Sequence, residues 1–246
     1  MYTRFADIYD ALTHDIHYSR WADYLQSAFL KFGVEPKLIL ELGCGTGSMA
    51  IELSKRNYEV IALDSSADML TRAYNKALEN DVDILFLNQD MRDFELYGTV
   101  DIIICLLDSL NYITSLEEVK KIFRLVNNYL NPGGLFIFDI NSAYKLSHTL
   151  GNEFFYELGE EISWIWKNTY DPKREITTFD LTFFVKQKNG LYERFDEIHE
   201  EKVYYSQQLI EALECNNLKL LGEYGDLTFN RPRADEERIF FIAQKA

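Results

Sequence analysis

The stretch that decides the fold is Leu38-Ile39-Leu40-Glu41-Leu42-Gly43-Cys44-Gly45-Thr46-Gly47, a short apolar strand that runs directly into a glycine-rich loop. Residues 48–56 then have helical spacing, so the loop joins a strand to a helix. Small residues let the backbone turn tightly and approach a ligand, and the amide groups at the helix start point towards it. The loop predicts a nucleotide-binding turn, while a plain tight turn is the alternative for the loop taken alone.

Three further strand ends carry acidic residues, which makes the pattern more specific than the loop. Asp64 closes the second strand about 20 residues after the loop, where a carboxylate can accept both hydroxyls of a ribose. Asp90 and Met91 follow the third strand, and Asp108 follows the fourth. Open parallel sheets bind ligands at the carboxyl ends of their strands, so we expect these residues to meet at one edge.

Apolar strands alternate with helices along most of the chain, the pattern of a doubly wound α/β sheet covered on both faces. Ser65 and Ser66 can cap one helix, Ser115 with Glu118 fits a capping box, and Ser206 can cap a third helix. The last two strands have no helical pattern between them. They predict an antiparallel C-terminal pair at the edge of a mainly parallel, seven-stranded, Rossmann-like sheet. The strands are expected at residues 38–40, 58–63, 84–87, 100–107, 135–140, 218–224 and 239–243.

The pattern changes after about Gly151, where apolar and polar residues alternate. A period of two is typical of antiparallel strands with one packed face. Asn189-Gly190 predicts a hairpin with a type I′ turn, because both central residues of that turn need positive φ. We therefore divide the chain into a helical lid at residues 1–35, a cofactor-binding core at 36–145 and 206–246, and an inserted antiparallel subdomain at 146–205.

The charge of the chain disfavours a nucleic-acid partner. The 246 residues include 25 basic and 40 acidic side chains, giving a net charge of −15 and no basic run. Such a surface repels phosphate backbones. The longest apolar run, residues 102–107, is too short to span a bilayer, and the N-terminus lacks the regions of a signal peptide. Three scattered cysteines indicate neither zinc nor disulfides, so we expect a protein of the reducing cytoplasm.

These residues resemble the class I S-adenosylmethionine-dependent methyltransferases. The resembling stretches are residues 41–47, Asp64, residues 89–91, residues 105–112 and residues 132–134. Within that class the chain looks like the small bacterial proteins that begin with a Phe-Ala-x-x-Tyr-Asp helix, here residues 5–10. It is more distantly similar to the N-methyltransferases of amino sugars and glycine. The resemblance implies S-adenosylmethionine as the cofactor.

The resemblance also implies roles for individual residues. The glycines would let the backbone contact the methionyl part, Asp64 would hold the ribose, Asp90 and Met91 the adenine, and the Leu106 carbonyl the ammonium. Aromatic residues of the opening helices would form a lid, with ordinary helix packing as the alternative. The cofactor-binding residues implied are Tyr9, Tyr18, Trp21, Glu41, Gly43, Gly45, Gly47, Asp64, Ser65, Met69, Asp90, Met91 and Leu106.

Methyl transfer from a sulfonium is an in-line displacement, so the protein mainly aligns the acceptor and excludes water. Neither a metal nor a covalent nucleophile is needed. The catalytic candidates are Asp108 and Tyr112, with Ser109 and Asn111 between them. His199 stands among charged residues and is interpreted as a solvated strand residue.

Two other functions share parts of this pattern. A NAD-dependent oxidoreductase has the same strand, loop and helix, but it would favour GxGxxG, whereas the spacing here is GxGxG. A cofactor-binding protein without turnover is the second alternative. For a methyltransferase we expect a small-molecule acceptor, an amine or a hydroxyl. The aromatic residues of the inserted subdomain would roof the acceptor pocket or form a homodimer face, and the oligomeric state is left open.

Overall fold

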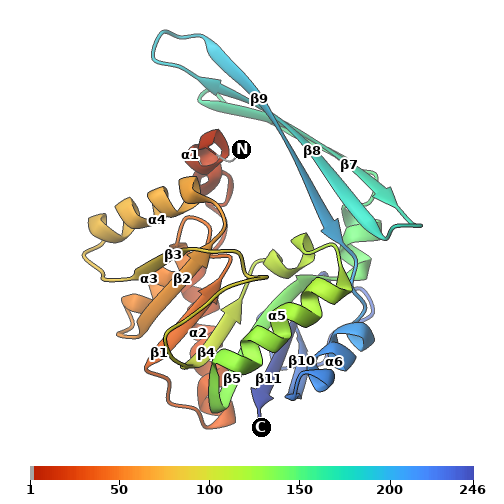
Figure 1. Ribbon diagram of the computed structural model, residues 1–246. Helices are drawn as coiled ribbons and strands as arrows, with labels where there is room; N and C mark the ends of the chain where they lie inside the picture. Colours follow the sequence, from red (N-terminus) through yellow and green to blue (C-terminus); the bar gives the residue numbers. More distant parts are fainter. Residues whose placement is uncertain (1–2) are drawn as a thin grey trace.

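The described residues, 3–246, form two sheets with helices packed around the larger one, as the computed structural model in Figure 1 shows. Residues 1–2 of the expected lid lie outside this range. The helices are α1 (Thr3–Leu12), α2 (Tyr18–Phe32), α3 (Ser48–Ser54), α4 (Ala67–Glu79), α5 (Leu116–Tyr129) and α6 (Ser206–Cys215), with short turns η1 (Ser109–Tyr112) and η2 (Lys145–Thr149). None of the helices in this range is long and apolar enough to cross a membrane.

The larger sheet has seven strands in the order β10-β11-β5-β4-β1-β2-β3. Its strands are β1 (Leu38–Leu42), β2 (Glu59–Asp64), β3 (Leu85–Asn88), β4 (Val100–Cys105), β5 (Leu130–Asn141), β10 (Leu218–Gly225) and β11 (Arg238–Lys245). Strands β1 to β5 pair in parallel, while β11 pairs antiparallel with both β5 and β10. The predicted α/β class, the parallel core and the antiparallel pair at the edge are confirmed, with β10 as the outer strand of that pair.

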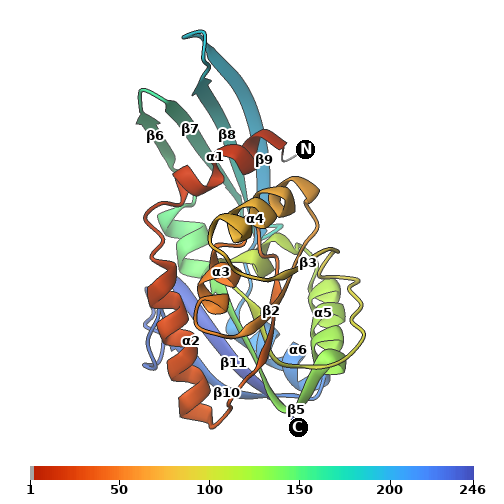
Figure 2. The same ribbon diagram turned by 90° about the vertical axis from the view of Figure 1, so that its left-hand side faces the viewer.

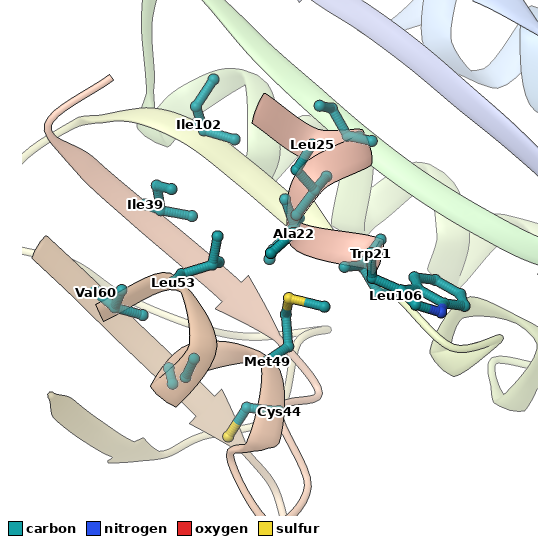
Figure 3. Close-up of a cluster of buried hydrophobic side chains, with 14 of the residues drawn as sticks. Trp21, Ala22, Leu25, Ile39, Cys44, Met49, Leu53, Val60, Ile102 and Leu106 are labelled. Atoms are coloured by element: carbon teal, nitrogen blue, oxygen red, sulfur yellow. The ribbon is translucent and has the colours of Figure 1, made fainter. Parts of the chain in front are cut away.

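Helices cover both faces of the larger sheet (Figure 2). Ile39 and Ile102 point from their strands into a core shared with α2 and α3, and the next residues, Leu40 and Ile103, point into the core beneath α5 and α6. Figure 3 shows the first of these cores, with Trp21 of α2 beside it. Strands that are apolar on both sides are buried between two layers of helices, as the two cores show.

The smaller sheet is antiparallel, in the order β6-β7-β8-β9, and extends beyond the carboxyl ends of the parallel strands (Figure 1). Its strands are β6 (Phe154–Leu158), β7 (Ile162–Asp171), β8 (Ile176–Lys186) and β9 (Tyr192–Lys202). Helix α1 lies between this sheet and α4 (Figures 1 and 2). The ring of Phe5 on α1 is 5.8 Å from that of Phe183 and 5.3 Å from that of His199.

Two helix starts differ from the prediction. Ser115 is the N-cap of α5, but its side chain makes no cap hydrogen bond, and Glu118, the other half of the expected capping box, pairs with Arg92 at 3.4 Å. Ser206 is the first residue of α6 rather than its cap, and Gln208 Oε1 accepts a hydrogen bond from the backbone N–H of Tyr205 at 3.1 Å. By contrast, Ser66 caps α4 as predicted, since its hydroxyl accepts from the N–H of Met69 at 3.3 Å.

The hairpin between β8 and β9 lies at Asn189-Gly190, but the turn type was predicted wrongly. Gly190 has φ 82°, whereas Asn189 is not among the residues with positive φ. The carbonyl of Gln187 accepts from Gly190 N at 2.8 Å, and Gln187 N donates to the carbonyl of Leu191 at 2.7 Å. This is a three-residue loop with a left-handed glycine, which needs only one positive φ.

Candidate active site

The glycine loop is built on three left-handed residues. Gly43, Gly45 and Gly47 have φ of 69°, 53° and 74°, a region that side chains disfavour. A Cβ on Gly43 would lie 3.0 Å from Met91 Cε, and one on Gly47 would lie 2.9 Å from Ala73 Cβ. Gly43 therefore keeps the space beside Met91 open, whereas Gly47 allows α4 to pack against the loop.

A cavity of about 360 Å³, the inner cavity, opens beside this loop at the carboxyl ends of the parallel strands. Its volume lies in the range of small-molecule sites. Eleven of the cofactor-binding and catalytic candidates line it, namely Tyr9, Gly43, Gly45, Asp64, Ser65, Met69, Asp90, Met91, Asp108, Ser109 and Tyr112. The three acidic strand ends therefore meet at one place.

The other implied residues do not line the inner cavity in the described chain. Trp21 packs into the core against Phe240, with ring centroids 5.3 Å apart, so packing accounts for its position. Tyr18 is half-buried beside Ser48, and burial raises the pKa of its hydroxyl. Glu41 is buried, Gly47 ends the loop against α4, and the carbonyl of Leu106 accepts from the hydroxyl of Ser109 at 2.8 Å.

Asp64 and Asp90 differ in their surroundings. The oxygens of Asp64 accept from Gly45 N at 2.9 Å and from Ser66 N at 2.8 Å, and burial raises the pKa of this carboxyl. Asp90 accepts from the guanidinium of Arg92, with Nη2 to Oδ2 at 2.5 Å, which lowers its pKa. Asp64 thus fixes the glycine loop, and Asp90 stays ionised at the cavity rim.

Asp108 lies on a strained turn. Leu107 and Asp108 have φ of 55° and 56°, which costs of order 1–3 kcal/mol for each residue. The fully buried Asp139 offsets this strain, since its oxygens accept from the N–H of Leu107 at 2.7 Å and of Asp108 at 3.1 Å. Arg238 of β11 also pairs with Asp139 and holds Asp108 Oδ1 at 2.8 Å.

The roles of Arg238 and Asp139 in this site were not predicted from the sequence. Asp139 sits within an otherwise apolar strand, which was a usable signal for a buried polar role, but its partner is 99 residues away. Asn111, a catalytic candidate, is fully buried and donates to the carbonyls of Asn141 and Lys202 at 3.2 and 2.9 Å. Asn111 therefore ties the smaller sheet to β5.

A second cavity of about 520 Å³, the outer cavity, lies between α1 and the smaller sheet. Five residues line both cavities: Phe5, Tyr9, Asp108, Tyr112 and His199. A ligand in one cavity and a ligand in the other would meet at this shared boundary. The outer cavity also includes Asn141, and Trp164 and Trp166 among the aromatic residues of the inserted subdomain.

The interpretation of His199 as a solvated residue was wrong. His199 is only 5% exposed, and its ring contacts those of Phe5 and Tyr112 at 5.3 and 5.8 Å. The alternation of β9 places it on the face that covers α1, although its sequence neighbours are charged. Burial lowers the pKa of this histidine.

The strand order, the glycine loop and the acidic strand ends define the Rossmann-like class of nucleotide-cofactor enzymes. A family model described as a methyltransferase domain matches residues 39–134. A protein of Geobacillus sp. (strain WCH70) that carries a methyltransferase name is 35% identical over 99% of both chains.

Two solved structures agree with this match. The crystal structure of an S-adenosylmethionine-dependent methyltransferase from Clostridium acetobutylicum ATCC 824 is 32% identical, covers 100% of this chain and 99% of that chain, and has a TM-score of 0.91. A sugar N-methyltransferase of Streptoalloteichus sp. ATCC 53650, 17% identical with a TM-score of 0.78, covers 96% of this chain and 92% of that chain and shares the fold.

The chain therefore belongs to the S-adenosylmethionine-dependent methyltransferases. S-adenosylmethionine is the cofactor and methyl transfer is the reaction, which sets aside the nicotinamide-dependent alternative. The inner cavity fits such a molecule. It combines a cradle kept open at Gly43 with the carboxylates of Asp64, Asp90 and Asp108, which suit a cationic nucleoside.

Proposed function

We propose that this methyltransferase holds S-adenosylmethionine in the inner cavity and transfers its methyl group to a small molecule, an amine or a hydroxyl, in the outer cavity. The observation that carries the proposal is the shared boundary, where Tyr9, Asp108, Tyr112 and His199 line both cavities. In-line transfer needs donor and acceptor on opposite sides of one opening.

The roles we assign within the inner cavity follow the chemistry of each side chain. Asp64 would accept from the ribose hydroxyls with the lone pairs that its two backbone hydrogen bonds leave open. Asp90 would accept from the adenine amino group as well as from Arg92, and Met91 would contact the ring. Ser65 and Met69, which line the same cavity, would lie on the ribose side. We propose that Tyr9 forms the lid over the cofactor and that Tyr18 and Trp21 support the lid without contacting the cofactor.

The bound cofactor supplies an activated methyl group, so the protein's own residues mainly position the acceptor and exclude water. Asp108 is fixed by Arg238, which makes it a positioning group for the acceptor. Tyr112 is 43% exposed at the shared boundary, where its hydroxyl could orient the acceptor atom. Burial raises the pKa of Tyr9, so its phenol stays neutral and can donate a hydrogen bond.

The domain division and the cellular setting belong to the same proposal. We propose that the inserted subdomain binds the methyl acceptor and that the core binds the cofactor. Three free cysteines, two of them buried, suit the reducing cytoplasm. Apolar side chains are exposed on the outer face of the smaller sheet, among them Tyr156 and Ile198. We therefore keep the prediction that two copies of the chain form a homodimer through this face.

Calorimetric binding of S-adenosylhomocysteine tests the proposal. The wild type should bind one equivalent, and Asp64→Asn should lose at least about tenfold in affinity, because hydrogen bonds to a charged group contribute about 1.5–3 kcal/mol. Asp83→Asn is the matched control, since Asp83 is exposed and outside both cavities. No binding to the wild type, or equal affinity for both variants, would refute the proposed site.

A further inference from the structure

The outer cavity has a polar end formed by Glu201, Asn141, Lys145 and Asp108. Glu201 is only 3% exposed, and its Oε2 accepts from the amide Nδ2 of Asn141 at 2.8 Å. The other side of that amide, Oδ1, accepts from Lys145 Nζ at 2.9 Å. Asn141 therefore fixes the Glu201 carboxyl in one orientation at the end of β9.

No ion pair neutralises Glu201 within residues 3–246. Lys145 Nζ donates to the Asn141 amide, which lies between Lys145 and Glu201, and Arg238 pairs with Asp108 and Asp139. A buried carboxyl without a cation is unfavourable by several kcal/mol, and groups of this kind are concentrated at binding sites. The position of Glu201 on the cavity wall therefore calls for a cationic group from a ligand.

The opposite end of the outer cavity is aromatic. Trp164 and Trp166 of β7 and Phe179 and Phe183 of β8 lie on one face of the smaller sheet, because strand register pairs Trp164 with Phe183. The rings of Trp166 and Phe179 meet edge to face at 5.5 Å. Flat apolar groups pack well against such a wall.

We propose that the outer cavity selects acceptors that carry an ammonium group on an aromatic body. The ammonium binds Glu201 at the polar end, and the ring lies against Trp164 and Trp166. The Glu201 carboxylate, which has no ion-pair partner among the described residues, disfavours a carboxylate or a phosphate beside it. This inference rests on the proposed function of the two cavities and adds the chemical class of the acceptor.

Phenethylamine, phenethyl alcohol and hydrocinnamate are suitable probes because they share a ring and differ in charge. Calorimetry is done on the full chain saturated with S-adenosylhomocysteine. The amine should bind at least about tenfold more tightly than the alcohol or the carboxylate, the effect expected of a hydrogen-bonded charge. Glu201→Gln should remove that advantage and leave the alcohol unchanged.

Glu200→Gln is the matched control. Glu200 neighbours Glu201 on β9 but lies on the other sheet face, where it pairs with Arg174. Its variant should bind the amine as the wild type does. The inference is overturned if no probe amine binds, if the carboxylate binds as tightly as the amine, or if Glu201→Gln keeps the preference. If the protein binds S-adenosylhomocysteine but fails these tests, the proposed acceptor class is refuted and the proposed cofactor site is not.

The pH dependence of the wild type gives a second test should Glu201→Gln fail to fold. Burial and the nearby Asp108 raise the pKa of Glu201, against the opposing effects of Lys145 and Arg238. His199, two residues along β9, has its pKa lowered by burial and adds no charge at neutral pH. Affinity for phenethylamine should rise with pH as Glu201 ionises, while affinity for phenethyl alcohol stays constant. A flat or falling profile for the amine contradicts the proposal.

Discussion

At the scale of single residues, Glu41 combines ionisable chemistry with nearly complete burial. It lies on β1 beside Ala50 of α3 and is 5% exposed, and its Oε2 has no hydrogen-bond partner among the described residues. Burial raises the pKa of this carboxyl from 4.5 to about 8, although the N–H of Ala50 opposes the shift. Glu41 is therefore neutral in the folded protein at neutral pH and ionised in the unfolded chain.

Replacement of Glu41 by Gln should change how stability depends on pH. Between pH 4.5 and about 8 the unfolded chain releases a proton that the folded protein keeps. The free energy of unfolding of the wild type should fall in this interval by up to about 1.4 kcal/mol per pH unit from this residue. Urea unfolding at several pH values should show Glu41→Gln gaining on the wild type as pH rises, with no gain at acid pH. Parallel curves would show that Glu41 is not held neutral.

At the scale of elements, α1 is fastened over the inner cavity by hydrogen bonds to the loop and to α4. Lys76 Nζ lies 2.7 Å from Asp10 Oδ2, 3.0 Å from Thr46 Oγ1 and 2.8 Å from Ser48 Oγ. The hydroxyl of Thr46 also donates to Asp10 at 2.6 Å. The same helix places Tyr9 at the shared boundary, so this tether links the glycine loop to the lid.

Lys76→Met should loosen α1 while leaving the core intact. Because Asp10 is half exposed, we expect a several-fold loss of affinity for S-adenosylhomocysteine rather than abolition. Hydrogen exchange at the amides of α1 should accelerate, and exchange in β1 and β4 should not change. Lys55→Met, which removes only an exposed contact with Asn80, serves as the control. Unaltered exchange in α1 would disprove the tether.

At the scale of the whole molecule, local patterns predicted the architecture well. The glycine loop, the apolar strands and the switch to period two predicted the two sheets because each is a pattern confined to a short stretch of the chain. The acidic strand ends predicted where Asp64, Asp90 and Asp108 meet, since topology forces the carboxyl ends of parallel strands to one edge.

The parts of the site that were missed depend on contacts between distant segments. Asp108 is 130 residues from Arg238, and Asn141 is 60 residues from Glu201. Charge in the local sequence made His199 seem solvated, whereas the packing of β9 on α1 buries it. Tertiary burial overrides such local signals, so Glu201 and Lys145 at the polar end of the outer cavity had no signature in sequence, whereas Asp108 had one.

The most direct test of the account is a crystal structure of the protein with S-adenosylhomocysteine. We predict the ribose hydroxyls on Asp64, the adenine beside Asp90 and Met91, and the sulfur facing the boundary between Tyr9 and Tyr112. The outer cavity would then remain open beyond the sulfur. A ligand bound outside the inner cavity, or a sulfur turned away from the outer cavity, would contradict the account.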